Sequence, residues 1–178
     1  MSATAPVRPE ASEYAPYYER YVSLVPDADL VETLERQGAE TLALLRGLSE
    51  EQGAHRYEPG KWSVKQLVGH ISDGERIFSY RALAFARGDA QALPGMEQDE
   101  WMAGVDFDAR TLSSLIDEFE SVRAATLHLL RHLSPEAWAR RGIASDNEVT
   151  VRALAYIIAG HVAHHVRVLR ERYLQGEG

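Results

Sequence analysis

Four long segments of this chain carry apolar residues at the three- and four-residue spacing of an α-helix. They run from about 30 to 47, 63 to 87, 109 to 133 and 151 to 174. This spacing places the apolar side chains on one face of each helix, and that face must be buried against another element. No comparable set of alternating apolar and polar residues predicts a sheet. The four segments therefore predict an all-α protein, a four-helix bundle.

The residues around these segments are those that start and stop helices. Asp29, Ser63 and Thr150 are N-cap residues, and Gln66 stands where it can complete a capping box with Ser63. Gly88 can end the second helix in a left-handed conformation. Between the long segments we expect short extra helices near 99–101 and 136–139, and an extended link or small hairpin over 143–149. The long connection between the second and third helices is typical of a binding loop or lid.

Length and charge limit the class of protein. With 178 residues the chain can form one domain with a sizeable core, which we place at 21–178, after a partly disordered segment at 1–20. The net charge of −8, from 19 basic and 27 acidic residues, argues against a nucleic-acid partner. No apolar run is long enough to span a membrane, and the first residues lack a signal-peptide pattern. We therefore expect a cytoplasmic protein without a membrane partner.

The chain contains no cysteine. Disulfide bonds, cysteine-ligated zinc and a cysteine nucleophile are therefore excluded. Any metal site must use histidine, aspartate or glutamate side chains.

Two histidines, His161 and His165, stand four residues apart within the apolar stripe of the fourth segment. Residues at this spacing lie one above the other on a helix, so both imidazoles can reach one metal ion. Neighbours such as Leu154, Ile158 and Val162 place this face towards a core. Two buried imidazoles need partners, and a metal ion is an efficient one.

His128 and His132 have the same spacing and serve as an internal control. The apolar stripe of the third segment passes through Leu129 and Leu133, so these two histidines lie about 100° away from it. We expect them on the surface.

The remaining histidines are weighed by their neighbours. His164 lies about 100° from His165, so we expect it to be exposed or to stand behind a ligand. His55 falls in a connecting loop without a recognisable partner. His70 flanks the apolar edge of the second segment and is the best third ligand, since two side chains alone would hold a metal weakly. Gly69 and Gly160, each next to one of these histidines, could permit close helix approach around the site.

Several motifs together resemble those of the DinB-like superfamily of damage-inducible and metal-dependent proteins, which includes relatives of bacillithiol transferases. The motifs are Gly-Lys-Trp-Ser at 60–63, Gly-His-Ile-Ser-Asp at 69–73, Glu-Arg-Ile-Phe at 75–78, Leu-Pro-Gly at 93–95 and Gly-His-Val-Ala-His-His at 160–165. Their order and spacing carry the resemblance, which covers nearly all of the chain after the first twenty residues.

The resemblance implies a four-helix bundle, often a homodimer, with a divalent metal such as Zn²⁺ or Ni²⁺. Carried over residue by residue, the implied ligands are His70, His161 and His165. It also suggests a small-molecule substrate, because the superfamily includes enzymes that transfer low-molecular-weight thiols such as bacillithiol or mycothiol to electrophiles and thiol-dependent isomerases, beside many members with no known activity. No substrate-specific motif is present in this chain.

Three functions follow. The first is a metal-dependent enzyme that transfers a low-molecular-weight thiol to a small electrophile, the thiol being a cosubstrate because the chain lacks cysteine. The second is a metal-dependent hydrolase of a small ester or amide, with Asp73 or Glu75 assisting proton transfer. Both acids also fit a solvated face, with Glu75 paired to Arg76 or a neighbouring helix, and we favour that placement. The third is a non-enzymatic metal-binding stress-response protein.

An enzyme needs a pocket beside its metal, whereas a storage or scaffold protein does not. Trp62, Phe78, Met96 and Trp101 could line such a pocket. Aromatic and methionine side chains at helical spacing more often pack in a core, and we expect that role for these four.

Overall fold

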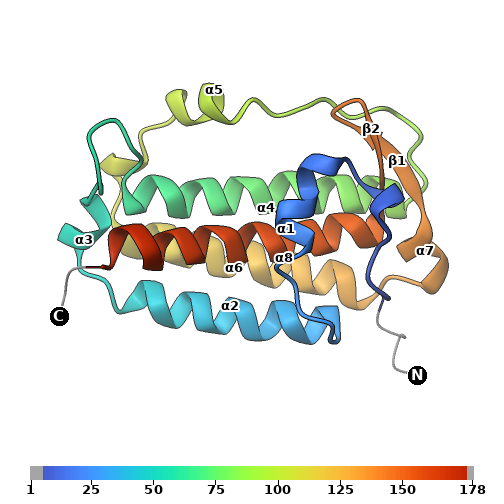
Figure 1. The fold of residues 1–178 in the computed structure, drawn as a ribbon, viewed down its shortest axis with the longest axis horizontal. Coiled ribbons are helices and arrows are strands. Elements are labelled where there is room, and N and C mark those ends of the chain that lie inside the picture. The colour runs from blue at the N-terminus through green and yellow to red at the C-terminus, as the bar shows by residue number, and fades with distance from the viewer. Residues whose placement is uncertain (1–5, 176–178) are drawn as a thin grey trace.

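The computed structural model describes residues 6–175 and shows a bundle of four long helices (Figure 1). These are α2 (Leu30–Arg46), α4 (Val64–Ala86), α6 (Leu112–Arg131) and α8 (Val151–Val168). The side chains of Asp29, Ser63 and Thr150 accept hydrogen bonds from the first turns of α2, α4 and α8, and Gln66 completes the capping box. The predicted fold class and these caps are confirmed.

Each long helix packs against two of the others. Both α4 and α2 contact α6 and α8, so α4 and α2 lie at opposite corners of the bundle. Figure 1 shows that α4 and α6 run in the same direction and that α2 and α8 run in the other. Because α4 and α6 are parallel, the link at 87–111 must return along the whole bundle. This link holds α5 (Gln98–Ala103) and the short 3-10 turn η3 (Phe107–Ala109).

Shorter elements close the ends of the bundle. α3 (Glu50–Ala54) follows α2, and α7 (Pro135–Ala139) leads into an antiparallel hairpin of β1 (Arg141–Ala144) and β2 (Asn147–Thr150). The hairpin, the helix at 135–139 and α5 confirm the three expected short elements. The last turns of α8 widen into a π-helical stretch, η4 (Leu169–Tyr173). Leu93 pairs with the hairpin at Ala144, which anchors the start of the long link.

The segment before α2 packs against α8. Residues 1–5 lie outside the described residues, and η1 (Ala11–Glu13), η2 (Pro16–Tyr18) and α1 (Glu19–Val22) follow. Although we expected partial disorder up to residue 20, Glu13 is buried, accepts a hydrogen bond of 2.8 Å from Thr150 and pairs with Arg152. A Cβ at position 160 would lie 2.0 Å from the backbone oxygen of Tyr21, so Gly160 lets α1 lie directly on α8. The division into 1–20 and one domain at 21–178 stays a prediction.

The apolar interior consists of two clusters of buried side chains, one towards each end of the bundle. One includes Phe78 and Ala159, and the other includes Ile71 and Val162. On α8, His161 therefore lies where the two clusters meet, and on α4 His70 lies between Val68 and Ile71 of the second cluster. Across the part of the chain that the structure describes, no helix combines the length and the apolar character needed to cross a bilayer.

Candidate metal centre

The structure brings His70, His161 and His165 together between α4 and α8. One nitrogen from each imidazole lies within 4.8 Å of the others, and the Nε2 atoms of His70 and His161 are 3.0 Å apart. The ring centroids are 4.5 to 4.9 Å apart. We call these three residues the histidine triad.

His70 and His161 are buried, His165 is half-buried, and all three are uncharged at neutral pH. Burial, together with the nearby His164, lowers the pKa of His70 to about 4. Burial, His70 and His164 lower the pKa of His165 to about 3, and burial lowers the pKa of His161 well below its usual value. Within residues 6–175 none of the three rings forms an ion pair with a carboxylate. Each neutral imidazole carries one nitrogen lone pair that can bind a metal ion, and the lone pair of either His70 or His161 here accepts the hydrogen bond between their Nε2 atoms.

Aromatic rings and one glycine set the positions of the imidazoles. The ring of Trp62 lies 4.9 Å from that of His70, and the ring of Tyr21 lies 5.4 Å from that of His161. A Cβ at position 74 would stand 2.8 Å from Cε1 of His161. Gly74, rather than Gly69 or Gly160, is thus the glycine that makes room for the triad. A Cβ at position 69 would instead meet the ring of Phe107.

This donor set fits a divalent transition metal. Two imidazole nitrogens that bind one Zn²⁺ at about 2.1 Å in tetrahedral geometry are about 3.4 Å apart. The Nε2 atoms of His70 and His161 are 3.0 Å apart and the three nitrogens lie within 4.8 Å of one another, so ring movements of about an ångström would suffice for binding. Neutral nitrogen donors suit Zn²⁺, Ni²⁺ and similar ions, and three of them leave coordination positions for a substrate.

Two pockets reach the triad from different sides. The first, of about 410 Å³, is lined by His70, His161, Phe78, Met96 and three tyrosines of the N-terminal segment, namely Tyr17, Tyr18 and Tyr21. We call it the tyrosine pocket. The second, of about 290 Å³, is lined by His164, His165, Lys61, Trp62, Tyr57 and Tyr173. We call it the tryptophan pocket. Gln98 and Asp99 at the start of α5 line both pockets, so the long link borders each of them.

The expected core role of the four large side chains is only partly met. Phe78 is buried in the apolar interior and also lines the tyrosine pocket, where Met96 joins it. Trp62 lines the tryptophan pocket, and Trp101 is 47% exposed and lines neither pocket. Side chains at the border of a cavity serve both packing and binding, and residue spacing alone does not separate the two roles.

Glu75 is not on a solvated face, which corrects the expectation for this residue. Its carboxylate is 1% exposed and receives two hydrogen bonds of 2.8 Å from Arg123 on α6, so the alternative of pairing with a neighbouring helix holds. Asp73 is half-buried, pairs with Arg76 at 3.4 Å and lines neither pocket. Burial raises the pKa of Asp73. Neither acid borders the space beside the triad.

The other histidines are where the spacing places them, with one addition. His128 and His132 are exposed on the far side of α6, as expected. His164 is half-buried and its ring lies 5.0 Å from that of His165. His55, for which no partner was expected, has its ring 6.4 Å from the ring of Tyr173.

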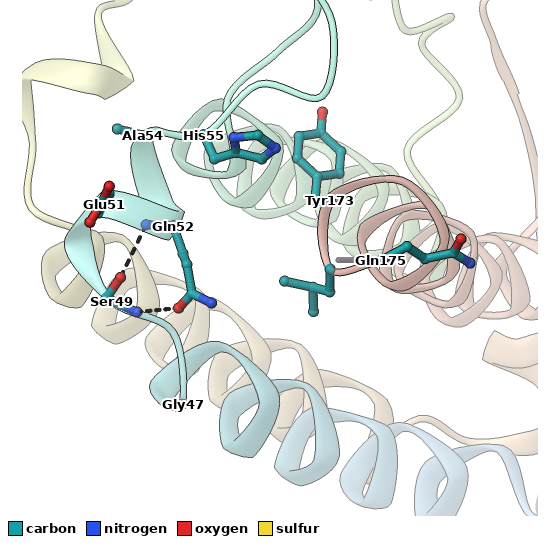
Figure 2. A pocket seen from close by; sticks show the side chains of 9 residues that line it. Gly47, Ser49, Glu51, Gln52, Ala54, His55, Tyr173 and Gln175 are labelled. Atoms are coloured by element: carbon teal, nitrogen blue, oxygen red, sulfur yellow. Dashed lines mark hydrogen bonds between the residues drawn. The ribbon is translucent and has the colours of Figure 1, made fainter. Parts of the chain in front are cut away.

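A third pocket, of about 860 Å³, opens where α3 meets the end of α8. Figure 2 shows His55 and Tyr173 facing each other at its upper edge, and Ser49 and Gln52 joined by their capping hydrogen bonds. No residue of the triad lines this pocket. Although this pocket is large, it is therefore not part of the metal centre.

Sequence reasoning missed the tyrosines of the N-terminal segment. Tyr14, Tyr17, Tyr18 and Tyr21 follow helical spacing, and this stripe is the signal that could have placed the segment against the bundle. Gln98 and Asp99 carry no comparable signal, because only the return path of the long link brings them to the site.

Two proteins are similar in sequence to about three quarters of this chain. A protein of Oceanobacillus iheyensis named "putative metal-dependent hydrolase" is 26% identical over 138 residues, which cover 76% of this chain and 77% of the relative. A protein of Halalkalibacterium halodurans with the same description is 24% identical over 134 residues, which cover 75% and 78%.

Solved structures show the same fold. YfiT from Bacillus subtilis, described as a probable metal-dependent hydrolase with an unusual four-helix bundle topology, matches with a TM-score of 0.67 at 17% identity, covering 92% of this chain and 89% of YfiT. A mycothiol-dependent maleylpyruvate isomerase matches with a TM-score of 0.64 at 12% identity, covering 82% of this chain and 61% of the isomerase. The family model of the DinB superfamily matches residues 33–169, a range that contains the whole triad and all four long helices except the start of α2. The chain therefore belongs to the DinB superfamily.

Proposed function

We propose that this protein is a metal-dependent enzyme that transfers a low-molecular-weight thiol to a small electrophile, with His70, His161 and His165 as the metal ligands. The observation that carries the proposal is the pair of pockets that meet at the triad. A transfer between two molecules needs a place for each reactant, whereas addition of water needs a pocket for one. A closed storage site would need neither.

The chain's own residues account for binding and orientation. The neutral imidazoles of the triad hold the ion, and the rings of Trp62 and Tyr21 keep two of them in place. When bound, the ion supplies Lewis acidity that lowers the pKa of a thiol. In the tryptophan pocket, Lys61 and His164 border the space beside His165, where they can contact polar groups of a reactant. Because the chain has no cysteine, the thiol must come from a cosubstrate.

Hydrolysis is the second candidate, and the names of the relatives favour it. The expected assistance from Asp73 or Glu75 is not supported by their positions, since one pairs with Arg76 and the other is enclosed with Arg123. Asp99 is a carboxylate that does line both pockets. Hydrolysis of esters or amides that persists without thiol and falls in Asp99→Asn would favour this candidate.

The metal site is tested by elemental analysis of the untagged protein and of His161→Ala. Loss of one of three ligands should weaken Zn²⁺ binding by more than about 100-fold, since even residues behind the ligands contribute 10- to 100-fold. His128→Ala, which alters an exposed histidine, is the matched control and should bind like the parent. Equal metal content in His161→Ala would overturn the ligand set.

The reaction is tested with the metal-loaded protein, a panel of thiols (cysteine, bacillithiol, mycothiol) and a chromogenic electrophile. Consumption of one thiol that disappears in His161→Ala supports transfer. Bound metal without consumption of thiol, ester or amide would leave a non-enzymatic metal-binding protein. The homodimer and the cytoplasmic location stay predictions, which equilibrium sedimentation and cell fractionation can check.

A further inference from the structure

The tyrosine pocket is bordered by a chain of aromatic rings that leads from the surface to the triad. The Tyr17 ring lies 5.3 Å from that of Tyr18, the Tyr18 ring 6.0 Å from that of Phe78, and the Phe78 ring 5.9 Å from that of His161. All three contacts are edge-to-face. Rings arranged in this way leave faces and edges open for a further ring, which prefers the same geometry.

Tyr17 at the outer end of this chain is not packed as a core residue. Its exposed fraction is 54%, although its neighbour Tyr21 is 7% exposed. An aromatic ring held at the mouth of a cavity next to two others forms a surface that a ligand ring can cover. Tyr80 on α4 is 55% exposed but borders neither the tyrosine nor the tryptophan pocket, so exposure and residue type do not by themselves mark a site.

The charged residues that line the tyrosine pocket limit the charge of a ligand that can bind there. Glu97 and Asp99 line it, and no lysine or arginine does. Arg20 and Arg81 pack on the rings of Tyr17 and Phe78, with guanidinium carbons 4.2 and 5.9 Å from the centroids, but neither arginine lines the pocket. The lining therefore favours an uncharged or positively charged ligand over an anion.

We infer that the tyrosine pocket binds small molecules through an aromatic ring that is uncharged or cationic. A ring packed on Tyr17 and Tyr18 would direct its substituent past Phe78 towards His161, since Phe78 adjoins both Tyr18 and that imidazole. If the ligand is the electrophile, the inference gives its chemical class, a compound with an aromatic ring, and in that respect it rests on the proposed function. Ring binding itself requires neither metal nor turnover.

The probes are four molecules of similar size: benzyl alcohol, benzylamine, benzoate and cyclohexylmethanol. Their dissociation constants are measured by ligand-observed NMR on the full-length protein, both zinc-loaded and after chelation. Benzyl alcohol and the benzylammonium ion should bind at least about fivefold more tightly than benzoate and cyclohexylmethanol. The chelated sample matters because a carboxylate can bind the metal directly, which would tighten benzoate in the zinc-loaded sample alone.

Variants locate the binding in the pocket. Tyr17→Ala, an exposed position, should weaken benzyl alcohol at least about fivefold, and the matched control Tyr80→Ala should leave it unchanged. Glu97→Gln with Asp99→Asn should reduce the preference for benzyl alcohol over benzoate in the chelated protein. Equal binding of all four probes, tighter binding of benzoate in the chelated protein, or equal effects of Tyr17→Ala and Tyr80→Ala would each overturn the inference.

These outcomes are independent of those for the proposed function. Ring binding with no metal in the protein leaves the inference intact and refutes the metal proposal. Metal binding with no preference among the four probes does the reverse.

Discussion

Two buried polar clusters lie on neighbouring faces of α4, and they are completed in opposite ways. Glu75 and Arg123 form an ion pair whose remaining donors are also used: Arg123 donates to the carbonyl oxygen of Leu34 at 2.8 Å and contacts the side chain of Gln37. Gln37 in turn donates to the carbonyl oxygen of Ala159 at 2.7 Å. One network thus ties together α4, α6, α2 and α8.

The triad has no such completion among the residues that the structure describes. The buried imidazoles of His70 and His161 and the half-buried imidazole of His165 face one another, and no carboxylate within residues 6–175 pairs with them. A buried cluster whose donors and acceptors are all paired holds helices together, whereas the nitrogen donors of the triad suit a metal ion. The ion pair therefore explains stability, and the triad is the part of the interior on which the proposed function depends.

The largest expected effect concerns the ion pair. Glu75→Gln leaves the Arg123 guanidinium buried without a counter-charge and should lower the free energy of unfolding by about 3–5 kcal/mol, measured by urea denaturation. The double variant Glu75→Gln with Arg123→Met should recover part of this loss. Glu35→Gln is the matched control, since Glu35 and Arg131 form an exposed pair between helices, worth about 0–1 kcal/mol. A loss as small as that of the control would remove the structural role of the network.

The next effect is a pH dependence of the metal-free protein. The pKa of His70 is about 4 when folded and 6.5 as a free side chain, so between these values the unfolded state binds more protons. Stability is then complete above pH 6.5 and is lost as the pH falls towards 4, by about 3 kcal/mol from His70 alone. Denaturation curves from pH 7.5 to 4.5 measure it. His161 and His165, whose pKa values are also lowered, contribute to the same slope, so His70→Gln should reduce it without removing it, and an unchanged slope in that variant would contradict the assignment.

The smallest effect separates metal binding from packing. Gly74→Ala places a methyl group 2.8 Å from the His161 ring and should weaken Zn²⁺ binding about tenfold. Its stability should change by no more than about 1 kcal/mol, because alanine favours the helix by a similar amount. In Gly69→Ala the methyl group meets Phe107 instead, so stability should fall and zinc affinity should persist. Identical behaviour of the two variants would mean that Gly74 does not make room for the triad.

The sequence predicts the parts of this molecule that depend on local spacing. The capping box of Ser63 and Gln66 and the apolar stripes identify the four long helices, and the stripes also distinguish His161 from His128. The position of each histidine around its helix was enough to identify the triad, because its residues lie on the helix faces that the bundle must bury.

What could not be predicted depends on partners far along the chain. The position of Glu75 around α4, between the apolar face and the solvated face, predicts neither burial nor exposure. Glu75 is buried because it pairs with Arg123, which lies 48 residues later on a helix parallel to α4. Gly69, Gly74 and Gly160 are alike in sequence, yet they face Phe107, His161 and the backbone of Tyr21. The residues next to a glycine in the sequence do not indicate which distant residue packs against it in the fold.

The contact of α1 with α8 has a consequence for the order in which the protein assembles on the ribosome. The tyrosines of the N-terminal segment are translated long before α8, the helix that the segment packs against. Glu13 can accept its hydrogen bond from Thr150 only after a further 137 residues have been synthesised. At about 5–20 residues per second, this interval lasts roughly 7 to 27 seconds. One wall of the tyrosine pocket is therefore among the first parts synthesised, but it can dock only after α8 has been made. A nascent chain can thus contain the first helices of the bundle before the tyrosine pocket has formed.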